Sequence, residues 1–162
     1  MNNKAFKNKK GFALVELMVA CSIIVVATFA LVSAGQKGIV LSERALRQTQ
    51  ASYLLEEGAE VMKIIRDGGW SSVSSLSSGT TYYLSYDNST NTWSISTTAN
   101  TIDSFFTRSI VLSDVKRDSN DDIASSGTTD SHIKKVTVTV TWNASTGSVS
   151  KDLSFYLVDI FS

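Results

Sequence analysis

The hydrophobic positions form three successive patterns along the chain. An almost continuous apolar run covers residues 12–34, a helical pattern follows over residues 35–67, and short alternating runs begin after residue 68. A run of about 23 residues makes a helix of about 35 Å, which is long enough to cross a bilayer. The patterns predict a membrane-spanning helix, an amphipathic helix and a strand-rich head, which together make an α+β fold.

The second pattern, over residues 35–67, contains good helix formers and no proline. Its apolar residues recur on one face at helical spacing: Leu54, Gly58, Val61 and Ile65. The charged residues between 56 and 66 fall mostly on the other side, where a solvated helix face is expected and not a pair of catalytic carboxylates. The pair Gly68-Gly69 predicts the end of the helix. One face of this helix should therefore pack on a sheet.

The third pattern consists of short runs with the composition of β-strands. They cover residues 80–86, 92–97, 105–115, 133–142 and 153–161. Alternation is clearest before Trp142, where valines share one face with the tryptophan and threonines share the other. A hairpin loop is expected over residues 143–150. The predicted fold is a long helix whose outer half lies on an antiparallel β-sheet.

Charge is unevenly distributed although the totals balance. The chain has 15 Lys and Arg and 15 Asp and Glu, but four lysines lie within the first ten residues, where there is no acid. Positive charge before an apolar helix, with no comparable charge immediately after it, places the N-terminus in the cytoplasm and the rest of the chain outside. The neutral total gives no strong field for nucleic acid or an anionic surface.

Glu16 is the only acidic or basic side chain in the apolar run. A carboxylate inside a membrane helix costs about 2.5 to 3.5 kcal/mol, so it needs either a partner or a function. The alternative is a position near the lipid headgroups, where Glu16 stays solvated.

The residues around Glu16 resemble the class III signal of type IV prepilins and pseudopilins. Residues 9–18 read Lys-Lys-Gly-Phe-Ala-Leu-Val-Glu-Leu-Met: a basic leader that ends in glycine, then phenylalanine, with glutamate at the fifth mature position. The resemblance implies that a prepilin peptidase cuts between Gly11 and Phe12 and methylates the new amine of Phe12. It also implies that Glu16 neutralises the Phe12 amine of a neighbouring subunit and sets the register of assembly.

Two departures from the family pattern narrow the expectation. Ala13 stands where the family usually has threonine, which affects neither the cut nor the charge pair. Major type IV pilins often carry a proline in the membrane half of the helix, whereas this chain has none and only Gly35 and Gly38 are candidates for a weak point. This favours a minor pilin or pseudopilin. Residues 53–70 also look like the helix end of minor pilins and of I-type pseudopilins.

The resemblance implies an organisation in which residues 1–11 are a removed leader and residues 12–34 a transmembrane and filament-core helix. Residues 35–67 are then an amphipathic helix and residues 68–162 a β-sheet head. The implied partners are other pilin subunits, the prepilin peptidase, an inner-membrane assembly platform and, before assembly, membrane lipid. The implied final location is a cell-surface or periplasmic filament. Adhesion, motility, DNA uptake and secretion all remain open as its task.

Two alternatives compete with this interpretation. Val32-Ser33-Ala34 has the small residues of a secretory cleavage site, but the apolar run exceeds the usual 7 to 15 residues, and Glu16 would be purposeless in a discarded peptide. The other alternative is a membrane-anchored extracytoplasmic binding module that does not polymerise, in which Glu16→Ala would leave function unchanged.

A calcium site is a further expectation of the sequence. Oxygen-bearing side chains alternate as at the start of a calcium loop, and one more acid follows nearby: Asp118, Asn120, Asp122 and Asp130. The glycine and glutamate of a full EF-hand loop are missing. Some pseudopilins bind calcium in a late loop, so calcium is the one cofactor considered, beside an ordinary polar turn.

No catalytic constellation is visible in the sequence, so no enzyme activity is expected. His132 is the sole histidine, Cys21 lies in the apolar run, and no Gly-x-Ser-x-Gly elbow occurs. One group of residues would suit stacking on single-stranded DNA, although cross-strand packing explains it better: Tyr82, Tyr83, Tyr86, Trp93, Lys134 and Lys135.

Overall fold

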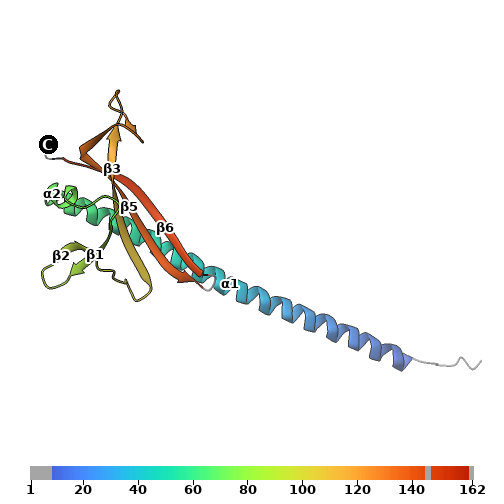
Figure 1. Ribbon diagram of the computed structural model, residues 1–162. Coiled ribbons are helices and arrows are strands. Elements are labelled where there is room, and N and C mark those ends of the chain that lie inside the picture. Colours follow the sequence, from blue (N-terminus) through green and yellow to red (C-terminus); the bar gives the residue numbers. More distant parts are fainter. Residues whose placement is uncertain (1–8, 145–146, 161–162) are drawn as a thin grey trace, which may run out of the picture. The chain divides into compact units, whose positions relative to one another are not determined.

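The computed structural model describes residues 9–144 and 147–160, with side chains from residue 12 onward. It forms two compact units, Met1–Arg47 and Gln48–Ser162, called here the helix unit and the sheet unit. The long helix α1 (Lys9–Asp67) contributes to both units (Figure 1). The remaining elements are α2 (Ser71–Ser74), β1 (Thr81–Asp87), β2 (Thr92–Ser96), β3 (Phe106–Arg117), β4 (Ile123–Ala124), β5 (Thr128–Ala144) and β6 (Gly147–Val158).

The strands form one six-stranded sheet in the order β2-β1-β3-β5-β6, with β4 paired to β3 off this path. All of its pairs are antiparallel. The longest ladder joins β3 to β5, from Phe106 opposite Trp142 to Arg117 opposite Thr128, with an irregularity between Asp114 and Val115. The predicted α+β fold, a long helix followed by an antiparallel sheet, is confirmed.

The core of the sheet unit lies between one face of the sheet and the C-terminal part of α1 (Figure 1). On β5, Val136, Val138 and Val140 are fully buried and Trp142 is nearly so, while the threonines between them are half-buried. On α1, the buried residues recur at helical spacing: Ala51, Leu55, Gly58, Ala59, Val61 and Met62. Both periodicities predicted from the sequence are therefore confirmed, and they bury the same core.

Gly58 allows α1 to approach the sheet closely. A Cβ atom at this position would lie 2.8 Å from Cγ1 of Val138 and 3.0 Å from Cδ of Arg108. Arg108 itself is buried: its Nη1 donates to Oε2 of Glu57 at 2.5 Å and to the Leu54 carbonyl at 3.2 Å. A buried guanidinium thus lies between strand β3 and helix α1, paired with a half-exposed carboxylate.

The ends of the elements test the predicted boundaries. Helix α1 ends at Asp67, directly before the predicted Gly68-Gly69 stop. The hairpin loop expected over residues 143–150 is wrong in extent, because β5 continues to Ala144 and β6 begins at Gly147, which pairs with it. Gly147 has φ +120°, a conformation that side chains disfavour, so a glycine suits the start of β6 here. The short elements α2 and β4 were not predicted.

Candidate functional site

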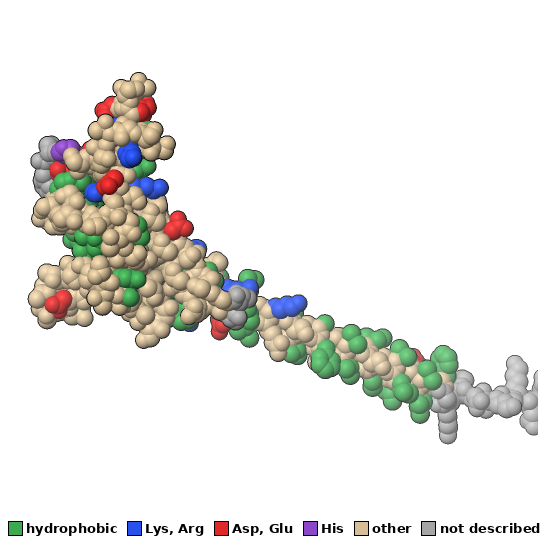
Figure 2. Space-filling model, viewed as in Figure 1, with side chains coloured by type: hydrophobic (Ala, Val, Ile, Leu, Met, Phe, Trp, Pro, Cys, Tyr) green, Lys and Arg blue, Asp and Glu red, His purple; other side chains and the backbone are tan. Residues whose placement is uncertain are grey.

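The apolar part of α1 exposes its entire circumference within the helix unit. Every residue from Phe12 to Leu46 is exposed, including Phe12 at 77% and Leu31 at 74%. Figure 2 shows these side chains as green patches along the helix. A helix that is apolar all round requires burial in a membrane or against other protein. By length and composition, this helix is long and apolar enough to cross a membrane.

Two hydroxyl side chains within the apolar segment bond to its own backbone. The hydroxyl of Ser22 donates to the Met18 carbonyl at 2.7 Å, and that of Thr28 donates to the Ile24 carbonyl at 2.5 Å. Both hydroxyls are therefore satisfied without water, as a hydrocarbon environment requires. Glu16 is left as the only charged side chain of residues 12–34, and it is exposed.

The predicted processing site lies at the start of the same helix. Gly11 is in the first turn of α1, and Phe12 follows directly. Phe12 and Glu16 are four residues apart, so they share one face of the helix and are separated by about 6 Å along its axis. The structure thus places a candidate new N-terminus beside the single membrane carboxylate. The cleavage, methylation and pairing of these residues stay predictions.

A family of known proteins matches this segment. The sequence model described as "Prokaryotic N-terminal methylation motif" matches residues 6–32. The chain carries a type IV pilin signal. Together with the long apolar helix, the motif supports a type IV pilin-like or pseudopilin protein anchored in a membrane, and proteins with this motif are structural and not enzymatic. Comparisons of the chain with curated proteins and with solved structures give no significant match.

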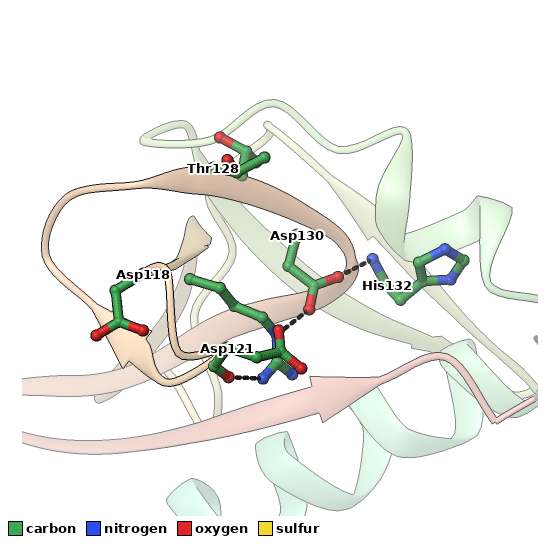
Figure 3. Close-up of a pocket in the computed structure, with 7 residues that line it drawn as sticks. Asp118, Asp121, Thr128, Asp130 and His132 are labelled. Atoms are coloured by element: carbon green, nitrogen blue, oxygen red, sulfur yellow. Dashed lines mark hydrogen bonds and ion pairs between the residues drawn. The ribbon is translucent and has the colours of Figure 1, made fainter.

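The predicted calcium ligands lie in and around the loop between β3 and β5. Oδ1 of Asp118 accepts the backbone N–H groups of Asn120 and Asp122, at 2.8 and 3.1 Å. Asn120 and Asp122 are exposed. Asp118 lines a shallow pocket that also includes Asp130, whereas Asn120 and Asp122 do not line it (Figure 3). The structure therefore brings together only two of the four predicted ligands.

Asp130 already binds protein donors with both carboxylate oxygens. Oδ2 accepts from Nε of Arg117 at 2.6 Å, and Oδ1 accepts from the backbone N–H of His132 at 2.8 Å (Figure 3). Arg117 Nη1 also donates to the Asp121 carbonyl at 2.6 Å. Within residues 9–144 and 147–160, no three His, Cys, Asp or Glu residues are placed to hold a metal ion. Calcium binding stays a prediction, and the Arg117 cation opposes it.

Two carboxylates of the sheet unit form ion pairs with basic side chains. These pairs predict that the free energy of unfolding decreases at acid pH. The Arg117 side chain, followed by the His132 backbone N–H, lowers the pKa of Asp130. The Lys134 ammonium, followed by Ser78, lowers the pKa of Asp114. A carboxyl group with a lowered pKa in the folded state stabilises that state above its ordinary pKa, and this contribution is lost as pH falls through the lowered value.

The expected result is a free energy of unfolding that is steady between about pH 7 and pH 5 and falls below about pH 4. Chemical denaturation followed by tryptophan fluorescence measures this profile. The variants Asp114→Asn and Asp130→Asn should each be less stable at neutral pH and show a shallower acid limb. An unchanged acid limb in the double variant would contradict the role of these pairs.

The residues considered for DNA stacking lie in different environments in the structure. Tyr86 and Trp93 face each other across β1 and β2, with ring centroids 5.1 Å apart, so the cross-strand packing predicted for them is confirmed. Tyr82 is buried, and its hydroxyl accepts the Ser77 N–H at 2.9 Å. Lys134 is paired with Asp114. DNA binding stays an untested prediction without support from this arrangement.

Two arginines that organise the sheet unit were missed by sequence reasoning. Arg108 lies on the same buried face of β3 as Phe106 and Ile110. The available signal in the sequence was therefore a charged residue at a position where the alternation predicts an apolar one. Arg117 directly precedes the acidic residues 118–122. This position was the available signal, because a cation near carboxylates competes with a metal ion for them.

Proposed function

We propose that this chain is a structural subunit, a minor pilin or pseudopilin, of a type IV pilus or a type II secretion-like filament. The observation that carries the proposal is the exposed apolar helix that bears both the methylation motif and a single carboxylate. Such a helix requires a nonpolar environment, first in the membrane and then among the helices of other subunits.

Leader removal gives the charge on Glu16 a partner. A cut between Gly11 and Phe12 creates a cationic amine at the tip of an apolar helix. An unpaired charge in that environment is costly, and a carboxylate from an adjacent helix offsets the cost if the two helices are staggered along the axis. Glu16 thereby couples subunit addition to one register.

The proposed organisation keeps residues 1–11 as leader, 12–34 as membrane and filament-core helix, 35–67 as amphipathic helix and 68–162 as head. Helix α1 continues through Gly35 and Gly38 without a proline, which supports a minor subunit. The partners are other pilin subunits, a prepilin peptidase and an inner-membrane platform. The N-terminus is cytoplasmic before assembly, and the mature chain then becomes part of a cell-surface or periplasmic filament.

The N-terminal mass of the native chain tests the proposal directly. In the host, the mature chain should begin at Phe12 and be about 14 Da heavier than the unmodified residues 12–162. Deleting the host's prepilin peptidase should restore the full-length mass. A chain that begins at Met1 or at Gly35 in the wild-type host contradicts the proposal.

A further inference from the structure

The β3–β5 hairpin beyond Arg117 is closed by a tight backbone contact. Arg117 pairs with Thr128, and the short strand β4 pairs back onto β3 within the same loop. A Cβ atom at Gly127 would lie 2.0 Å from the Arg117 carbonyl oxygen, and Gly127 has φ +137°. Only glycine fits there, so the returning chain passes directly over the backbone of Arg117.

The Arg117 side chain occupies the place where the sequence suggested a metal ion. Its Nε lies 2.6 Å from Oδ2 of Asp130 and 3.5 Å from Oδ1 of Asp121, while Nη1 donates to the Asp121 carbonyl. In Figure 3, dashed lines mark the interactions that Asp121 and Asp130 make with other residues lining the pocket. The Asp130 side chain is only 15% exposed, so its charge has little access to water. A planar guanidinium satisfies several oxygens at fixed directions, as this arrangement requires.

We infer that Arg117 is the resident cation of this hairpin and that the hairpin keeps its fold without a divalent ion. Calcium takes six to eight oxygens, so it would need Asp130 and its neighbours freed from their present donors. Arg117 would then lose its carboxylate partner and lie beside a doubly charged ion. At the start of the loop, Asp118 already accepts two backbone N–H groups. Arg117 and backbone N–H groups thus supply donors to Asp118 and Asp130 from within the chain.

Calcium titration of the full chain in detergent micelles tests the inference. Up to about 10 mM CaCl₂, well above the 10⁻⁴ to 10⁻³ M range of weak extracellular sites, the unfolding midpoint should shift by less than about 1 °C relative to EGTA. MgCl₂ at equal ionic strength serves as the comparison. Calorimetric calcium binding with one-to-one stoichiometry, or a midpoint rise of several degrees with calcium only, would overturn the inference.

Hydrogen exchange of residues 118–132 gives the local readout. Arg117→Gln removes the charge, and exchange there should accelerate at least about tenfold, since charged hydrogen bonds are lost. Lys116→Gln is the matched control: it removes an equal charge from the neighbouring, exposed position of β3, and exchange should stay unchanged. Unchanged exchange in Arg117→Gln, or equal acceleration in both variants, would refute the role of Arg117. Neither result depends on filament assembly, so failure here is distinct from failure of the proposed function.

Discussion

Replacing Gly58 by leucine is expected to destabilise the sheet unit by about 3 kcal/mol, because overpacking a filled core costs about 1 to 3 kcal/mol and sometimes more. Even the first added carbon would lie 2.8 Å from Cγ1 of Val138, a short branched side chain that is fully buried. It would also lie 3.0 Å from Cδ of Arg108, whose displacement would break the pair with Glu57. Leucine favours the helix over glycine by roughly 1 kcal/mol. Any loss of stability in Gly58→Leu must therefore come from packing and must exceed this gain in helix propensity.

Gly38→Leu is the matched control, since it makes the same change on the same helix. A Cβ atom at Gly38 meets nothing within 4 Å. The midpoint of denaturation, followed by tryptophan fluorescence of the full chain in micelles, should fall in Gly58→Leu and should not fall in Gly38→Leu. Equal midpoints for both variants would show that α1 does not press on β5 as the structure indicates.

The elements that sequence predicted well are those whose periodicity follows from burial. Val136, Val138 and Val140 alternate because only one face of the sheet is covered, and the apolar stripe from Leu55 to Met62 covers it. The membrane segment was visible because an all-apolar run needs no tertiary context. The acid at Glu16 was visible because it interrupts that run.

The details that sequence missed depend on contacts between distant residues. The sequence placed Asp130 among possible calcium ligands, but it could not show that the register of β3 against β5 brings Arg117 onto this carboxylate. Strands β5 and β6 remain paired as far as Ala144 and Gly147, whereas polar composition alone suggested a loop over residues 143–150. The close approach at Gly58 likewise exists only once the helix lies on the sheet.

Replacing Glu16 by glutamine is expected to reduce the amount of this chain in sheared filaments at least about tenfold. Removing one partner of a buried charge pair costs about 2 to 5 kcal/mol, and 1.4 kcal/mol already corresponds to tenfold. The uncharged residue should also make the membrane-embedded form more stable, because a carboxylate is costly in hydrocarbon. Assembly and membrane insertion should therefore change in opposite directions.

Glu43→Gln is the control for this prediction, because Glu43 is exposed, lies on the same helix and falls outside the apolar run. Immunoblots of sheared and membrane fractions measure the partition, and the N-terminal mass establishes that each variant is processed at Phe12.

If processed Glu16→Gln enters filaments as well as Glu43→Gln does, the carboxylate sets no register. If processed wild-type chain is found only in the membrane fraction, the chain is an anchored module and its helix never leaves the bilayer. By contrast, a Glu16→Gln chain that is processed normally and is still absent from filaments would show that the charge of Glu16 is needed for assembly and not for the cut after Gly11.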